Sequence, residues 1–114
     1  MEIAAAALTA LVALLHFGFL YMETLGWDKM ARRFGQSPEA TEITRPMALN
    51  QGFYNAGLAS VLLWALLTGA QATVIAMLLY VIAMAIVGAA SVNKRIFIIQ
   101  GVPAVLALGA TLLA

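Results

Sequence analysis

The chain has 114 residues, of which 64% are hydrophobic and only 10% are charged, and its mean hydropathy is +0.99. Soluble globular domains are about half apolar and about a quarter charged, so this composition predicts an integral membrane protein. A net charge of +1 provides no broad basic surface, and we therefore expect no nucleic-acid partner. The chain has no cysteine, which excludes disulfides, Fe–S clusters and thiol nucleophiles within one chain.

Apolar stretches divide the chain into four parts, each long enough to cross a membrane as a helix of about 20 residues. The expected spans are about residues 3–24, 46–69, 73–92 and 96–114, within a single domain of residues 1–114. We predict helices because lipid offers no partner for an unpaired backbone group and a chain this short cannot close a barrel. The predicted fold class is an all-α membrane protein, a four-transmembrane-helix bundle.

The first connection, GWDKMARRFGQSPEATEIT, is the only long and polar one. Trp27, Met30 and Phe34 recur there at three- and four-residue spacing opposite basic residues, which predicts a short amphipathic segment at the membrane interface. Ser37 and the proline after it have the pattern of a helix N-terminus. That helix should run on into the second span, with a bend near Pro46. The second connection, TGAQAT, is only long enough for a tight helical hairpin.

Lysine and arginine occur only in the first and third connections. They are Lys29, Arg32, Arg33, Arg45, Lys94 and Arg95. With four spans these connections lie on one side of the membrane, and the positive-inside rule makes that side cytoplasmic. Both termini are therefore expected outside, with membrane lipid as the surrounding partner.

The strongly polar side chains of the spans fall in the cytoplasmic half of the bilayer. At 1.5 Å per residue, those of the second span reach only about 5 to 15 Å into the membrane. The outer half is expected to hold only threonines and Tyr80 as polar groups. Intramembrane polar groups in one half predict a shallow pocket that opens to the cytoplasm.

Helical periodicity indicates which faces should meet. Thr9, His16 and Glu23 are seven residues apart and return within about 20° of one face. On the second span one stripe comprises Asn50, Tyr54, Gly57, Val61, Trp64 and Thr68. These two stripes are predicted to face each other. Small residues should allow close helix contacts, namely Gly52, Gly57, Gly88, Ala89, Gly101 and Ala104. Pro103 is predicted to bend the fourth helix.

Four stretches together, HFGFLYMETLGW, SPE, LNQGFYNAGLA and KRIFIIQGVPA, resemble the small four-span bacterial membrane proteins grouped as domain of unknown function 1304. The resemblance covers nearly the whole chain and implies the same fold and a bacterial cytoplasmic (inner) membrane, but no activity. The positions that match its pattern are His16, Glu23, Asn50, Gln51, Gly52, Tyr54, Asn55, Arg95, Gln100, Gly101 and Pro103. The stretch TRPM departs from the proline-free helix expected there.

Candidate site residues follow from their chemistry. His16 and Glu23 are the candidate general acid or base. The candidate ligand-binding residues are Asn50, Gln51, Tyr54, Asn55, Gln100 and Trp64. A metal site and a cofactor are not expected, because one histidine and scattered acids give no ligand spacing. Each residue also has a structural alternative: His16 as an interhelical hydrogen bond, Glu23 as a partner of Arg45 or Arg95, and the carboxamides as locks between helices.

Three functions are compatible with these residues. The first is a binding protein or small acid–base enzyme that takes an amphiphilic or lipophilic molecule from the cytoplasmic leaflet. The second is a structural or assembly subunit whose polar residues only lock the bundle. The third is a small multidrug-type transporter, which the one-sided Lys and Arg distribution disfavours. A homo-oligomer is compatible with all three.

Overall fold

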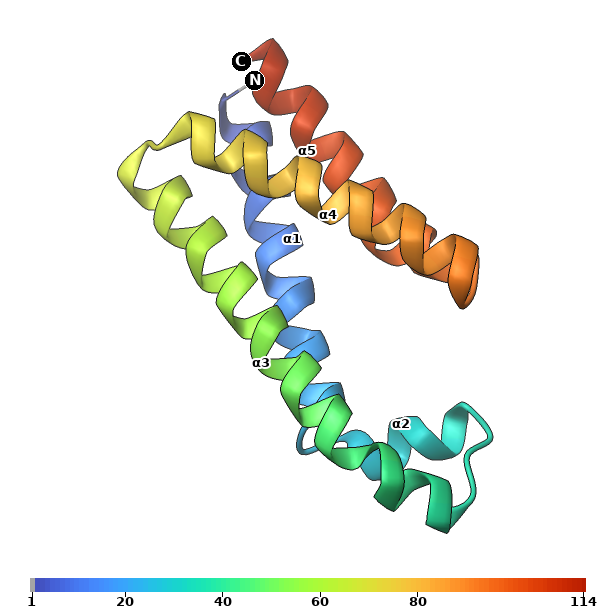
Figure 1. The fold of residues 1–114 in the computed structure, drawn as a ribbon. Helices are drawn as coiled ribbons and strands as arrows, with labels where there is room; N and C mark the ends of the chain where they lie inside the picture. Colours follow the sequence, from blue (N-terminus) through green and yellow to red (C-terminus); the bar gives the residue numbers. More distant parts are fainter. Residues whose placement is uncertain (1) are drawn as a thin grey trace.

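A computed structural model of the chain describes residues 2–114, and these form an all-helical rod with extents of 48 × 25 × 17 Å. The helices are α1 (Glu2–Glu23), α2 (Trp27–Arg33), α3 (Pro38–Thr68), α4 (Gln71–Ser91) and α5 (Val102–Leu113). A π-helical turn, η1 (Phe97–Gly101), runs directly into α5. Figure 1 shows the two chain termini side by side at one end, with α2 at the other.

Two of these helices, α1 and α4, are long and apolar enough to cross a membrane. Helix α3 is longer, with 31 residues, but its first half carries charges and carboxamides. The continuous stretch Phe97–Leu113 of η1 and α5 is apolar and shorter. The structure thus confirms helices at the four predicted places, and membrane-crossing length and hydropathy at two of them.

The predicted start of α3 is confirmed. Ser37 is the N-cap, its Oγ accepts from the Ala40 N–H at 3.1 Å, and Pro38 is the first helical residue. Helix α3 then continues through Pro46 without a break, so the TRPM departure does not interrupt it. It ends at Gly69, whose φ of 71° is left-handed and whose N–H bonds Ala65 and Leu66. This turn makes the predicted tight hairpin, with α4 starting at Gln71.

Helix α1 is the centre of the packing, because it lies against both α3 and α5. Helix α4 packs on α5, on η1 and on α3. The buried core comprises Val12, Ala13, Ala59, Leu62, Ala65, Val74, Leu78, Val81, Ala104 and Ala107. These residues lie nearer to the end that holds the termini, so the other end of α1 and α3 is less enclosed.

The disturbance predicted at Pro103 takes the form of the π turn. Pro103 has no N–H, and its ring would collide with the carbonyl four residues earlier in a regular helix. A wider turn before the proline relieves that collision. The Val102 N–H accordingly bonds Phe97 O, five residues back. Gly101 is buried at this turn, and a Cβ on it would lie only 2.7 Å from the Phe97 ring.

Candidate functional site

The contact between α1 and α3 near α2 depends on Gly52 and on one polar pair. A Cβ on Gly52 would lie 3.1 Å from Thr24 Cγ2 and 3.4 Å from Leu20 O, so the helices meet closely at this point. One turn further along α3, the Asn55 Nδ2 donates to Glu23 Oε1 at 2.6 Å. Among the sequence candidates, the structure brings Glu23 and Asn55 into direct contact.

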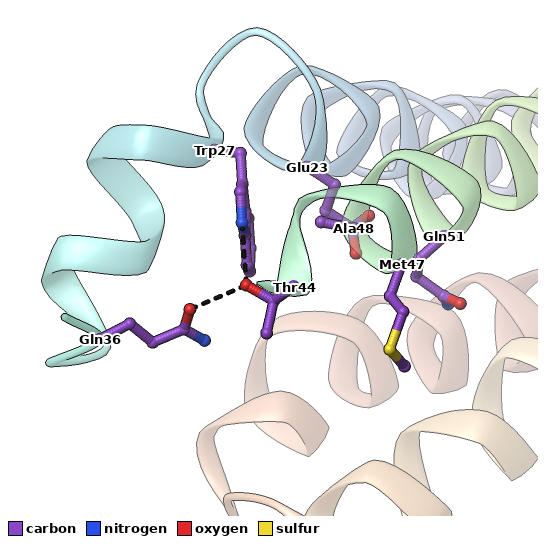
Figure 2. A pocket seen from close by; sticks show the side chains of 7 residues that line it. All are labelled: Glu23, Trp27, Gln36, Thr44, Met47, Ala48 and Gln51. Carbon is purple, nitrogen blue, oxygen red and sulfur yellow. Dashed lines mark hydrogen bonds between the residues drawn. The ribbon is translucent and has the colours of Figure 1, made fainter. Parts of the chain in front are cut away.

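Beside this contact is a hollow of about 280 Å³, which we call the α2 groove. It is lined by Glu23, Trp27, Gln36, Thr44, Met47, Ala48 and Gln51. Figure 2 shows these side chains, with Trp27 and Gln36 on the α2 side and the others from α1 and α3. The α2 groove therefore contains two of the predicted site residues, Glu23 and Gln51.

Helix α2 is held over α3 by hydrogen bonds at the wall of the α2 groove. The Trp27 Nε1–H donates to Thr44 Oγ1 at 3.3 Å. The Thr44 hydroxyl lies 2.9 Å from both Gln36 Oε1 and Ala40 O and donates to one of them. These bonds, two of them drawn in Figure 2, fix the indole and the Gln36 carboxamide in place.

A surface ion cluster completes this attachment. Arg45 on α3 pairs with Asp28 on α2 and with Glu42 one turn earlier on its own helix. The hydrogen bond from Arg45 and its positive charge lower the pKa of the Glu42 carboxyl. The sequence alternative in which Arg45 pairs with Glu23 is therefore wrong, because Arg45 points toward α2 instead.

His16 lies in the core and away from the α2 groove. Its side chain is 2% exposed, and its Nδ1–H donates to Val12 O one turn earlier at 2.8 Å. Phe19 meets the ring edge-on with centroids 5.2 Å apart, and the Gln100 carboxamide of the π turn lies beside it. In the bond to Val12 O the Nδ1–H is the donor, since a carbonyl only accepts. His16 and Gln100 thus form a second polar contact, between α1 and η1.

One expectation about α3 is wrong. The predicted stripe through Tyr54 and Trp64 does not face α1, since Tyr54 is 69% and Trp64 58% exposed. Asn50 and Gly57 are exposed as well, and a Cβ added to Gly57 would meet no atom within 4 Å. The face that meets α1 is made of small and aliphatic residues: Ala48, Gly52, Ala59, Leu62 and Ala65. Small side chains occupy this face because they let the backbones of α1 and α3 approach each other closely.

Two sets of residues that line hollows in the structure were not identified by the sequence analysis. Gln36, Thr44 and Met47 enter the α2 groove only because α2 folds back on α3, which no periodicity reveals. At the opposite end, a hollow of about 370 Å³ is lined by Glu2, Gln71 and Thr111 among others, together with Thr9 of the predicted polar stripe. Glu2 and Gln71 lie just outside the predicted spans, so the expectation of only threonines and Tyr80 within them stays a prediction. Within residues 2–114, no three His, Asp or Glu side chains gather closely enough to hold a metal.

The α2 groove can bind a hydrogen-bond donor. Its acid, Glu23, is half-buried, and Asn55 occupies only one carboxylate oxygen. Gln36, Gln51 and Thr44 add carboxamide and hydroxyl groups around the acid, and Met47 and Ala48 supply apolar surface. Such a mixture of few polar groups on an apolar wall is typical of small-molecule sites.

Comparison with known proteins identifies the family to which the chain is related. The family described as "Protein of unknown function (DUF1304)" matches residues 10–112. The "Uncharacterized protein YpaA" of Lactococcus lactis subsp. lactis (strain IL1403) is 35% identical over 114 residues, covering 95% of this chain and 96% of that protein. No solved structure matches. With a match over nearly its whole length, the chain belongs to the DUF1304 family.

Proposed function

We propose that the protein crosses the cytoplasmic (inner) membrane of a bacterium four times, through α1, the second half of α3, α4, and η1 with α5. The apolar length of α1 and α4 supports this arrangement. The basic residues are in the connection that holds α2 and in the one between α4 and η1, while the termini lie together at the other end. By the positive-inside rule, α2 faces the cytoplasm and both termini face outward.

We infer that the α2 groove binds a small amphiphilic molecule from the cytoplasmic leaflet. The observation that supports this most is Glu23, a half-buried acid with one oxygen bound by Asn55 and the groove beside it. An acid in a membrane helix needs a polar partner or a wet cavity. A head group that donates hydrogen bonds would provide one, with Gln51 and Gln36 in reach of its other polar atoms.

The apolar part of the ligand would lie along the outer face of α3. Met47 lines the α2 groove and is 75% exposed, and residues seven positions apart share a helix face. Tyr54 and Val61 continue this face, followed by Trp64. The exposed aromatic side chains that do not meet α1 thus become the wall for an acyl or alkyl chain. The same face is also available to lipid or to a second copy of the chain.

Binding is a better proposal than acid–base catalysis. His16, the second candidate for proton transfer, is buried, uses Nδ1 on Val12 and does not line the α2 groove. Glu23 is the only acidic side chain that lines the α2 groove, so proton transfer there would depend on Glu23 alone. Transport is also disfavoured, because the packed core residues Val12, Leu62 and Leu78 come between the two hollows along the helices.

Native mass spectrometry of the protein in lipid nanodiscs tests this proposal. We expect a bound mass of roughly a few hundred daltons on the wild type, within the size range of ligands that such hollows hold. Glu23→Gln and Gln51→Ala should lose it. Asn50→Ala is the matched control, since Asn50 is an exposed carboxamide on the same helix outside the groove.

The structural alternative, in which polar residues only lock the bundle, is favoured by the Glu23–Asn55 bond. A substitution of Gln51 distinguishes ligand binding from a purely structural role, because this residue is exposed and lines the α2 groove. If Gln51→Ala loses the bound mass while its melting temperature stays at the wild-type value, the residue serves a ligand. If no bound mass occurs on the wild type, or if all three variants keep it, binding in this groove is refuted.

A further inference from the structure

The α2 groove carries a negative charge that no basic residue of its wall balances. Among the described residues that line it, Glu23 is the only charged one. Arg45, the only basic residue of α3, pairs with Asp28 and Glu42. Three further basic residues are exposed and do not line the groove, namely Lys29, Arg32 and Arg33 on α2. A charged head group that enters the α2 groove would therefore be attracted as a cation and repelled as an anion.

Glu23 has one carboxylate oxygen left for such a cation. The Asn55 Nδ2 donates to Oε1 at 2.6 Å and thereby holds the carboxylate at the contact between α1 and α3. Within residues 2–114 no side chain donates to Oε2. The Glu23 side chain is half-buried and lines the α2 groove, so a molecule in the groove can reach it. Because an ionised carboxylate only accepts hydrogen bonds, the ligand group at Oε2 has to be a donor.

Trp27 adds an aromatic face to the same groove. Its Nε1–H donates to Thr44 Oγ1 at 3.3 Å, which fixes the half-buried indole by its edge. Figure 2 shows the ring edge-on, with the Glu23 carboxylate on the side toward which one ring face is turned. The face of a tryptophan attracts a cation within about 6 Å of its centroid, more strongly than that of tyrosine or phenylalanine. A cation in the α2 groove would thus meet both a carboxylate and an aromatic face.

We propose that the ligand of the α2 groove is a primary alkylammonium amphiphile, whose ammonium group donates to Glu23 Oε2 and lies against the indole face of Trp27. The exposed Gln51 carboxamide can accept from another of its N–H groups. The alkyl chain leaves the groove past Met47, which is 75% exposed. This inference rests on the binding function proposed above and adds the charge and the chemical class of the head group.

Three probes with the same decyl chain test the charge of the head group: n-decylammonium, 1-decanol and n-decyl sulfate. An alkylamine has a pKa close to that of lysine, about 10.4, and is a cation at neutral pH. Each probe is added to the full chain in phosphatidylcholine nanodiscs, whose lipid has no net charge, and bound copies are counted by native mass spectrometry. We expect saturable binding of n-decylammonium to the wild type, and at least about tenfold weaker binding of the other two probes.

Variants of the two walls locate the cation. Glu23→Gln keeps the shape and an oxygen for Asn55, so it should fold, and it should weaken n-decylammonium binding about tenfold without weakening that of 1-decanol. Trp27→Phe and Trp27→Leu both lose the bond to Thr44, but only the leucine variant lacks an aromatic face. Trp27→Leu should therefore bind n-decylammonium about fivefold more weakly than Trp27→Phe does. Asn50→Ala, outside the groove, should bind as the wild type does.

Equal binding of n-decylammonium and 1-decanol to the wild type would overturn the assignment of the head group. A Glu23→Gln variant that still prefers the cation, or equal binding in the two Trp27 variants, would overturn it as well. If Gln51→Ala then weakens all bound probes alike, the groove binds amphiphiles and only their class is wrong. If n-decylammonium does not bind at all, the inference fails, while the mass that the wild type carries without probes still decides the binding function.

Discussion

Among single residues, Asn55 has the clearest energetic role, because its carboxamide joins α3 to the half-buried acid of α1. Asn55→Ala removes this bond and leaves Glu23 without a partner. We expect the free energy of unfolding to fall by about 1 kcal/mol, since interhelical hydrogen bonds in membrane proteins average below about 2 kcal/mol. Thermal unfolding in detergent measures the loss. Asn50→Ala, at an exposed carboxamide, should change stability little; equal losses in both variants would contradict a specific Glu23–Asn55 contact.

Also at the residue scale, the pH response of Glu42 reports its ion pair with Arg45 on the same helix. Arg45 lowers the Glu42 pKa, so this ion pair stabilises the folded chain above the ordinary carboxyl pKa and is lost as pH falls through the lowered one. Arg45→Gln should therefore raise the Glu42 pKa toward its ordinary value. An NMR titration of the side-chain carboxyl carbon measures it. An unchanged Glu42 pKa in the variant would mean that the contact does not form in solution.

At the scale of elements, the π turn before α5 depends on the absence of a side chain at Gly101. A Cβ there would lie 2.7 to 2.9 Å from atoms of the Phe97 ring, so Gly101→Ala must displace that ring. We expect a loss of about 1–3 kcal/mol, the usual cost of overpacking a filled site. Gly57→Ala is the matched control, because no atom lies within 4 Å of its added Cβ. Alanine should there stabilise α3 by up to about 1 kcal/mol. Thermal unfolding of both variants should give shifts of opposite sign, and a loss in Gly57→Ala would show that its face is covered.

The helices themselves were predictable, because their signals are local. Ser37 and Pro38 mark the start of α3, and the apolar runs place α1, α4 and the last helix within a few residues. The polar face of α1 was also predictable, since His16 and Glu23 repeat on it. Which residues lie on the outward face of α3 was not predictable, because Tyr54 and Trp64 have the same helical spacing whether their face meets a helix or lipid. What decides their direction is the close approach at Gly52, a property of two backbones rather than of one sequence pattern.

At the scale of the whole molecule, the number of spans decides on which side of the membrane each end of α4 lies. The chain has no native cysteine, so a single introduced cysteine can be placed at each end of α4 without background. Ala72 and Asn93 are both exposed; Ala72 is in the first turn of α4 and Asn93 follows its last residue by two positions. With four spans, a membrane-impermeant maleimide should label Ala72→Cys on intact cells and Asn93→Cys only after lysis. If only α1 and α4 crossed, the chain would return to the outside at the end of α4 instead of its start, and the two labelling patterns would be exchanged. The four-span arrangement would then be refuted.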